Sequence, residues 1–274
     1  FLLPSKEELY AMSDQDLEQK TRKVFHKLHA AHLADDYIAG RHTRIIETDR
    51  MGVESDFLCN LKCADLGCGS AVHGTVNLLE LGASYVNAMD LDESFIGLAE
   101  KRLRTDSKFN NRWQLDVGSL MELPYPDECF DFVLCAGVIH HTLDDQKAVD
   151  EIYRVMKSEA KAYLSVTGKG GLFNRFFMEL LRDEYRHNPE MQKIVKAGQL
   201  EAWLKEQITD LKSKIENDDE ESYRASISLM DNLFELIDND LVLSIIDVLE
   251  APIYKSYTED EWFLILENSG FQDY

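Results

Sequence analysis

The sequence lacks several features that would place it in particular classes of protein. No stretch of about 18 or more apolar residues occurs, so we expect no transmembrane span. The opening, FLLPSKEELY, is apolar for only three residues and then charged, which is not the pattern of a signal peptide. The five cysteines form no Cys-x-x-Cys pair. We therefore expect reduced thiols in a cytoplasmic protein.

Basic residues are also scarce. The 29 Lys and Arg residues are outnumbered by 51 Asp and Glu residues, which gives a formal net charge of −22. Enzymes that act on nucleic acids usually carry a basic stripe that neutralises phosphates. The acidity therefore argues against a nucleic-acid partner. With 274 residues, 45% of them hydrophobic, the chain is long enough for one large domain or a domain with an insertion.

The hydrophobic pattern changes twice along the chain. Residues 5–47 have a helical pattern, and from Leu61 to about residue 167 short apolar runs alternate with helical segments. This alternation predicts a parallel βαβ sheet, in which ligands bind beyond the carboxyl ends of the strands. After Gly171 the pattern is helical again, and YTEDEWFLILENSGF (257–271) predicts a last helix that ends at a glycine. One helical face after Gly171 carries Phe173, Phe176, Phe177, Leu180 and Leu181.

The segment CADLGCGSAVHG, residues 63–74, places an acid and two glycines after an apolar approach. A dinucleotide binds its pyrophosphate on such a turn, but the third glycine of its G-x-G-x-x-G fingerprint is replaced here by Val72. Asp65 would also bring negative charge close to the pyrophosphate. The loop therefore predicts a nucleotide-like ligand that carries no phosphate.

Acids stand at the predicted ends of three successive strands. Asp65 ends the first, Asp90 the second and Asp116 the third, and the fourth strand lies in ELPYPDECFDFVLCAGVIHHTLDDQKAVDEIYRVMK. Any one of these acids could be a helix cap or turn residue. Three of them beside a glycine loop, at the edge where a doubly wound sheet binds its ligand, favour a binding site.

This ordered set of motifs resembles the class I S-adenosylmethionine-dependent methyltransferases, in the type 11 branch that includes quinone-biosynthesis C- and O-methyltransferases. The resemblance covers about residues 40–167 and the final helix. It implies a doubly wound, Rossmann-like α/β sheet with S-adenosylmethionine as cofactor. The implied activity is methyl transfer to an N, O, S or C atom of a small or medium-sized organic acceptor. A cationic sulfonium also accounts for Asp65, which a pyrophosphate would not tolerate.

The resemblance also assigns residues to the cofactor. Asp90 can accept hydrogen bonds from both ribose hydroxyls, and Asp116 from the adenine amino group. An arginine before the first strand often holds the cofactor's carboxylate, and Arg44 is best placed here, with Arg41 second. The usual glycine turn before the fifth strand is replaced by KSEA (157–160), which we expect to affect a surface loop. The complete predicted cofactor set is Arg44, Asp65, Gly67, Gly69, Asp90, Leu91, Asp116, Val117 and the carbonyl of Ala136.

Histidines supply the candidate catalytic groups. His140 and His141 follow the fourth strand, and either could be a general base near neutral pH or serve a structural or cofactor-gating role. A second group resembles a metal cluster, but helical spacing spreads its first three members around the helix. We therefore expect surface or packing roles there and no metal site. That group consists of His26, His29, His32 and His42.

These patterns together predict four parts. They are an N-terminal helical cap (1–47), a Rossmann-like cofactor-binding core (48–171), an all-helical lid inserted after the fifth strand (172–250), and a return to the core (251–274). The chain stops where the family's last two strands would begin. An RNA-base or protein methyltransferase and a non-catalytic methyltransferase-fold subunit remain alternatives. The apolar helices of 172–250 could also form a homo-oligomer interface instead of a lid.

Overall fold

The computed structural model describes residues 12–32, 53–169, 178–215 and 239–273, together with residues 231, 235 and 237. The chain divides into two compact units, one formed by residues 171–250 and the other by residues 4–170 with 251–274. None of the helices within the described ranges is long and apolar enough to span a membrane.

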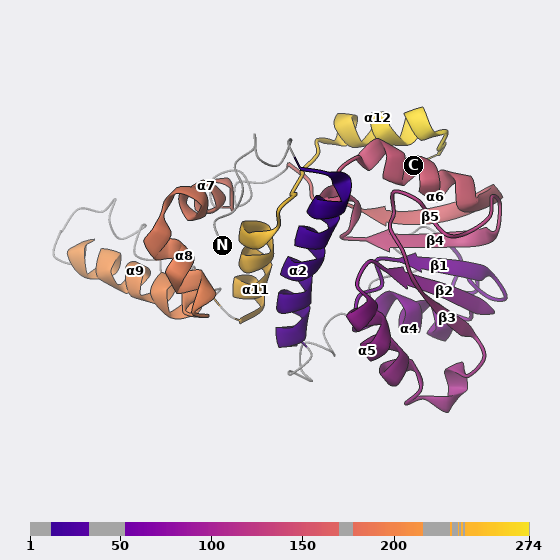
Figure 1. Cartoon of the computed structure of the whole chain (residues 1–274), viewed down its shortest axis with the longest axis horizontal. Coiled ribbons are helices and arrows are strands. Elements are labelled where there is room, and N and C mark those ends of the chain that lie inside the picture. Colours follow the sequence, from indigo (N-terminus) through magenta and orange to yellow (C-terminus); the bar gives the residue numbers. More distant parts are fainter. Residues whose placement is uncertain are drawn as a thin grey trace. The chain divides into compact units, whose positions relative to one another are not determined.

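The larger unit is built on a parallel sheet (Figure 1). Its strand order in the described residues is β3-β2-β1-β4-β5, so the order reverses between β1 and β4. Ligands of doubly wound folds bind outside the carboxyl ends of the strands at such a switch point. The strands are β1 (Lys62–Leu66), β2 (Tyr85–Asp90), β3 (Trp113–Val117), β4 (Phe130–Ala136) and β5 (Met156–Ser165).

Helices cover both faces of this sheet. Successive side chains of a strand point to opposite faces, and β4 shows the consequence. Phe132 and Leu134 pack into one buried cluster, whereas Val133 and Cys135 pack into the other. Helices α4 and α5 contact β1, β2 and β3, while α6 contacts β5 and α12 (Figure 1). The helices are α4 (His73–Glu80), α5 (Glu93–Leu103), α6 (Asp145–Val155) and α12 (Glu259–Ser269), with short 3-10 turns η1 (Ser107–Phe109) and η2 (Ile139–His141).

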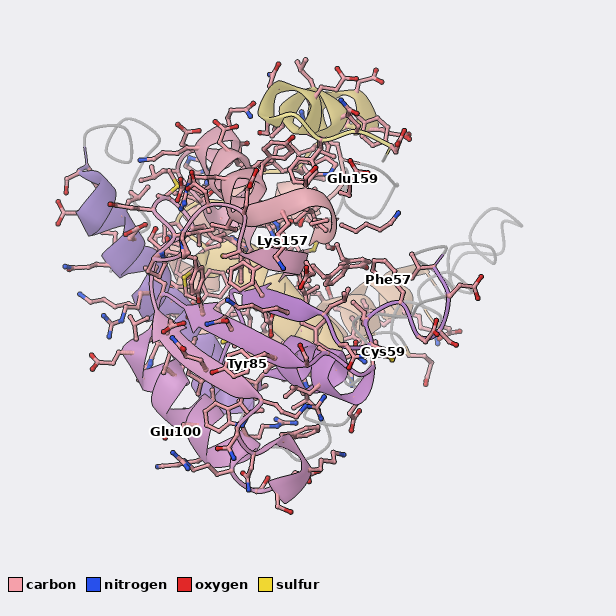
Figure 2. The ribbon with its side chains drawn as sticks, turned by 90° about the vertical axis from the view of Figure 1, so that its right-hand side faces the viewer. Phe57, Cys59, Tyr85, Glu100, Lys157 and Glu159 are labelled. Atoms are coloured by element: carbon pink, nitrogen blue, oxygen red, sulfur yellow. The ribbon has the colours of Figure 1, made fainter. Side chains whose placement is uncertain are left out.

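Strand β5 contains a large irregularity near its start. Phe130 pairs with Met156, and Phe132 pairs with Lys161, so residues 157–160 all stand opposite the single residue Asp131. Glu159 takes up a left-handed backbone conformation, with φ of 63°, and Lys157 Nζ lies 2.7 Å from Asp131 Oδ1. Figure 2 shows Lys157 and Glu159 in this part of the molecule. The KSEA segment therefore belongs to the strand as a bulge, which corrects the expectation of a surface loop.

The smaller unit is helical where it is described. Its helices are α7 (Glu179–His187), α8 (Pro189–Lys196), α9 (Leu200–Ile215) and α11 (Asn239–Glu250). Asn188 ends α7 and caps α8, because its side chain accepts hydrogen bonds from the main-chain N–H groups of Glu190 and Met191. Arg182 of α7 donates to the main-chain oxygen of Val248 in α11. Phe173, Phe176 and Phe177 lie outside the described residues.

The last helix of the larger unit has the ends that its sequence predicts. Thr258 accepts a hydrogen bond from the Glu261 N–H, and the Glu261 carboxylate accepts one from the Thr258 N–H, so the two form a capping box. Gly270, with φ of 101°, ends the helix in the left-handed conformation that favours glycine. The prediction of one helix with a glycine stop is confirmed.

Candidate cofactor and acceptor site

A cavity of about 200 Å³ lies at the switch point of the sheet, within the larger unit. The residues that follow β1, β2, β3 and β4 all contribute to it, as expected for a doubly wound fold. Of the predicted site residues, those that line the cavity are Gly67, Gly69, Asp90, Leu91, Ala136 and His141.

The glycine turn after β1 is shaped by close packing. Gly67 has φ of 80°, and a Cβ atom there would lie 2.3 Å from Cγ2 of Val138. Its N–H donates to the main-chain oxygen of Met89 at 2.8 Å, which ties the turn to the end of β2. A side chain at this position would therefore clash as well as strain the backbone. The turn exposes main-chain groups of Gly67 and Gly69 to the cavity.

Asp90 ends β2 with its carboxylate on the cavity wall. Its Oδ2 accepts a hydrogen bond from the Gly69 N–H at 2.9 Å, and its Oδ1 accepts one from the Asp92 N–H at 2.9 Å. Burial raises the pKa of the Asp90 carboxyl, and these N–H groups oppose that shift. Each carboxylate oxygen has two lone pairs, so each can accept a further hydrogen bond from a ligand hydroxyl.

Asp65 lies beside the cavity without lining it. Its side chain is only 4% exposed, and its Oδ2 accepts a hydrogen bond from the Thr75 hydroxyl of α4 at 2.6 Å. Burial raises the pKa of Asp65 to about 6, against the opposing effect of Thr75. The carboxylate also packs against Gly74, where a Cβ atom would lie 2.8 Å from it. In the structure this acid therefore joins β1 to α4.

Asp116 and Val117, at the end of β3, do not line the cavity either. The Asp116 carboxylate accepts hydrogen bonds from Gln114 Nε2 at 2.7 Å and from the Tyr125 hydroxyl at 2.9 Å. Val117 is 49% exposed. The neighbouring residue Gly118 does reach the cavity, and its N–H donates to the main-chain oxygen of Asp90 at 3.0 Å.

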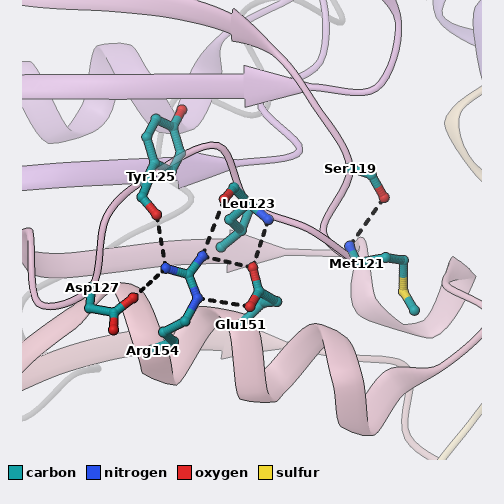
Figure 3. Close-up of polar contacts among 7 residues, drawn as sticks. All are labelled: Ser119, Met121, Leu123, Tyr125, Asp127, Glu151 and Arg154. Carbon is teal, nitrogen blue, oxygen red and sulfur yellow. Dashed lines mark hydrogen bonds and ion pairs between the residues drawn. The ribbon is translucent and has the colours of Figure 1, made fainter.

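The segment between β3 and β4 is held in place by an arginine of α6 (Figure 3). Arg154 donates to the main-chain oxygens of Tyr125 at 2.9 Å and Leu123 at 3.2 Å. It also pairs with the carboxylates of Asp127 and Glu151, at 2.7 Å and 2.8 Å. These contacts fix the segment whose earlier residues, Ser119 to Met121, line the cavity.

The two histidines after β4 have different surroundings. His141 lines the cavity, and its Nδ1 atom lies 2.8 Å from the main-chain oxygen of Ile253. His140 is buried outside the cavity lining. Burial, together with the neighbouring His141, lowers the pKa of His140 to about 3. The His140 ring is therefore neutral near pH 7, and of the two histidines only His141 reaches the ligand space.

Helix α2 (Asp14–His32) lies in the predicted N-terminal helical part and forms one wall of the cavity, although none of its residues was predicted to belong to the site. Four residues of α2 line the cavity, and they follow one another along the chain at intervals of three, one and three positions. They therefore lie on one face of the helix. The face carries mixed polar and aromatic side chains, so hydrophobic periodicity alone does not reveal it. Arg44 and Arg41, which were expected near the cofactor, lie outside the described residues. The α2 residues of the lining are Glu18, Thr21, Arg22 and Phe25.

Among the described residues, the lining carries more negative than positive charge. Its carboxylates in that part of the chain are those of Glu18, Asp90 and Asp92, whereas its one guanidinium there is that of Arg22, which is paired with Asp92 at 3.4 Å. This balance disfavours a pyrophosphate and suits a cationic sulfonium nucleoside. The carboxylate of Asp90 can likewise accept hydrogen bonds from a ribose. The glycine turn leaves room for another part of the ligand to approach the main chain closely. No group of three or more His, Cys, Asp or Glu residues in the described part of the chain could hold a metal ion.

Comparison with known families agrees with this geometry. Residues 64–164 match the family model Methyltransf_11, a methyltransferase domain. Over this segment the chain is similar to the type 11 methyltransferases. The match confirms the predicted family, its Rossmann-like fold class and its cofactor, S-adenosylmethionine.

Individual relatives match over part of their length. A demethylmenaquinone methyltransferase of Lactobacillus johnsonii is 30% identical over 106 residues, which are 38% of this chain and 43% of that protein. One from Listeria monocytogenes is 27% identical over 120 residues, 41% of this chain and 50% of that protein. The chain thus spans about half the length of the curated relatives it matches.

Solved structures with a similar fold are more distant in sequence. A proposed methyltransferase from Bacillus halodurans is 16% identical, with a TM-score of 0.45 over 78% of this chain and 63% of that one. An S-adenosylmethionine-dependent methyltransferase from Mesorhizobium loti is 22% identical, with a TM-score of 0.34 over 39% of this chain and 46% of that one.

Proposed function

We propose that this protein transfers a methyl group from S-adenosylmethionine to a small or medium-sized organic acceptor. The observation that carries the proposal is the carboxylate of Asp90, which lines a cavity at the switch point beside the glycine turn of Gly67 and Gly69. An acid at the end of the second strand can accept hydrogen bonds from both ribose hydroxyls, and each such charge-assisted bond is worth about 1.5–3 kcal/mol.

Six of the nine predicted binding residues have a proposed role. Asp90 accepts from the ribose, the Gly67–Gly69 turn allows the methionine part to approach the main chain, and the Ala136 carbonyl accepts from its amino group. Asp116 and Val117 stand at the end of β3, next to Gly118, on the side proposed for adenine. When bound, the cofactor supplies an electrophilic methyl group on a sulfonium. The protein's task is to hold donor and acceptor in line, which can lower the barrier by about 7–11 kcal/mol.

We assign His141 as the proton acceptor of the reaction. Its Nδ1 atom faces a main-chain carbonyl, which can only accept, so Nδ1 carries the hydrogen and Nε2 carries the lone pair of the neutral ring. As a nucleophilic N, O, S or C atom of the acceptor gains the methyl group, the proton it gives up passes to Nε2 and then to solvent. His140 has no such role in this proposal, because it is buried away from the cavity.

The character of the acceptor follows from the lining near His141. Phe25, Leu143 and Ile253 contribute apolar surface there, which favours an organic molecule with an apolar or aromatic body. Relatives named demethylmenaquinone methyltransferase support an acceptor of the quinone class. The acidic lining and the net charge of −22 argue against a nucleic acid.

Calorimetry followed by a transfer assay tests the proposal. The full chain should bind S-adenosylmethionine and its demethylated product, S-adenosylhomocysteine, but not NAD. With methyl-labelled cofactor, label should pass to a reduced quinone and not to RNA. Micromolar binding of NAD, with no signal from S-adenosylmethionine, would overturn the cofactor assignment. Transfer to RNA or to a basic protein would overturn the acceptor class while leaving the cofactor in place.

A further inference from the structure

Helix α2 brings a carboxylate to the part of the cavity that lies beyond β3. Glu18 and Ser119 both line the cavity, and the Ser119 hydroxyl donates a hydrogen bond to Oε1 of Glu18. The oxygen of that hydroxyl accepts from the Met121 N–H at 3.1 Å (Figure 3). A serine hydroxyl has one hydrogen to donate, and here Glu18 receives it. A ligand at this place therefore meets the Glu18 carboxylate as a hydrogen-bond acceptor.

The Glu18 carboxylate has capacity beyond this one hydrogen bond. In the described part of the chain its hydrogen-bond partner is Ser119, which uses Oε1. The side chain is only partly buried, and Oε2 is not one of the buried side-chain atoms that lack a partner. Oε2 therefore keeps accessible surface. Because each carboxylate oxygen has two lone pairs, Glu18 can accept further hydrogen bonds from N–H groups of a ligand.

The position of Glu18 along the cavity indicates which part of the cofactor it meets. The strand order places the glycine turn after β1 first along this edge of the sheet, then Asp90 at the end of β2, and then Ser119 after β3. The proposed function places the methionine part of the cofactor on the glycine turn and the ribose at Asp90. Because the ribose joins the methionine part to the base, the next group along this edge is the adenine.

Asp116 is less well placed to accept from that base. It pairs with Met89, the residue before Asp90, so it lies inside the edge of the sheet. Its carboxylate already accepts hydrogen bonds from two side chains and does not line the cavity. We propose that the carboxylate of Glu18, and not that of Asp116, accepts a hydrogen bond from the amino group of the cofactor's adenine. This inference rests on the proposed function.

Two further contacts hold α2 in the position that the inference requires. One turn after Glu18, Arg22 pairs with Asp92, which follows β2, at 3.4 Å. Phe25 then packs edge-to-face on His141, which follows β4, with ring centroids 4.7 Å apart. Asp92 is itself fixed, because its side chain caps α5. The helix is therefore held at the ends of three strands, with Glu18 at β3.

A deaminated ligand separates this binding role from a structural one. S-inosylhomocysteine carries a carbonyl oxygen where S-adenosylhomocysteine carries the amino group, and a carboxylate repels that oxygen. By calorimetry, the wild type should bind S-adenosylhomocysteine at least tenfold more tightly than S-inosylhomocysteine. Glu18→Gln should lower this ratio about tenfold, the value of one charge-assisted hydrogen bond, because glutamine can accept from the amino group or donate to the carbonyl. A residue that only held α2 in place would change both affinities equally.

Asp16→Asn is the matched control on the same helix. Asp16 also accepts from a serine hydroxyl, that of Ser13 at 2.7 Å, but it is exposed and does not line the cavity. Its substitution should leave the ratio of the two dissociation constants unchanged. An unchanged ratio in Glu18→Gln, or an equal loss of discrimination in Asp116→Asn, would overturn the inference. Failure of the wild type to bind S-adenosylmethionine and S-adenosylhomocysteine would instead overturn the proposed function.

Discussion

The Nδ1 atom of His141 lies 2.8 Å from the main-chain oxygen of Ile253, a residue 112 positions later in the chain. The contact joins the turn after β4 to the segment that leads into α12. It fixes the hydrogen of the neutral imidazole on Nδ1 and orients the ring at the cavity wall. A residue far from the motif thus determines which nitrogen of the candidate base carries the lone pair.

Replacing His141 by Asn tests its role as proton acceptor. The Asn side chain can still donate an N–H to the Ile253 oxygen, but it has no basic nitrogen. We expect kcat to fall about 10²- to 10⁴-fold, the usual contribution of a general base, with the dissociation constant of S-adenosylmethionine within about twofold of the wild type. Steady-state kinetics with the identified acceptor and calorimetry measure the two quantities.

A matched control exists on α7. His187 also has its Nδ1 atom 2.9 Å from a main-chain oxygen, that of Asp183, but it is exposed in the other compact unit. His187→Asn should therefore leave both kcat and cofactor affinity unchanged. If His141→Asn retains wild-type kcat across the pH range, His141 is not the base.

Asp90→Ala tests the ribose assignment. Both ribose hydroxyls would lose a charged acceptor, so we expect the affinity for S-adenosylmethionine to fall more than tenfold, since 1.4 kcal/mol corresponds to about a factor of ten. Asp106→Ala is the control, because Asp106 also accepts from a main-chain N–H, that of Lys108, but lies on the surface. An unchanged dissociation constant in a folded Asp90→Ala protein would show that this acid does not bind the cofactor.

The sequence predicted the sheet and the edge at which it binds a ligand. It did not predict toward which face of the sheet each acidic side chain points. Alternation of apolar runs was enough to place Asp90 at the end of β2. Asp65 was placed correctly on β1, but it shares a strand face with Cys63, which packs in the cluster beneath α4. Its carboxylate therefore meets Thr75 of α4 and not the cavity. Periodicity in one strand does not show which helix will cover each face.

The contribution of α2 and the bulge in β5 could not be predicted for a related reason. Both depend on partners far away in sequence. Arg22 and Asp92 are 70 positions apart and come from a helix and a loop with no shared motif. The sequence marks KSEA as a departure from the family's glycine turn, but the register shift around Asp131 exists only in relation to β4 and cannot be read from β5 alone. Local pattern identifies elements, whereas such contacts arise only when the elements pack.

The buried carboxyl of Asp65 predicts a pH dependence of stability. Its pKa is raised from 3.8 to about 6 in the folded protein, so the folded state holds this proton more tightly than the unfolded state. Stability from Asp65 is therefore fully present below about pH 4 and is lost as the pH rises to about 6. The loss in the free energy of unfolding is on the order of 3 kcal/mol for this shift.

Urea unfolding of the wild type and of Asp65→Asn between pH 4 and pH 7 measures this effect. Asparagine can still accept the hydrogen bond from Thr75 but does not titrate. The difference in free energy of unfolding between the two proteins should change across the window, with the wild type losing stability relative to the variant as the pH rises. Two curves that stay parallel from pH 4 to pH 7 would show that Asp65 is not a buried titrating group.

The division into two compact units allows binding and acceptor choice to be tested separately. Among the described residues, every one that lines the cavity belongs to the unit of residues 4–170 and 251–274. Cofactor affinity should therefore not depend on residues 172–250. We expect these helices to determine which acceptor is methylated, as a lid, although an apolar helical face can equally be buried against a second copy of the chain.

Replacing residues 172–250 by a short Gly/Ser linker distinguishes these two roles. A lid predicts a variant that binds S-adenosylmethionine within a few fold of the wild type but transfers no methyl group, because the acceptor is no longer held and water is no longer excluded. Sedimentation of both proteins then reports the oligomeric state. A wild-type dimer that becomes a monomer with full activity per chain would show that the helices are an interface. Loss of cofactor binding in a folded variant would contradict the assignment of that binding to the larger unit alone.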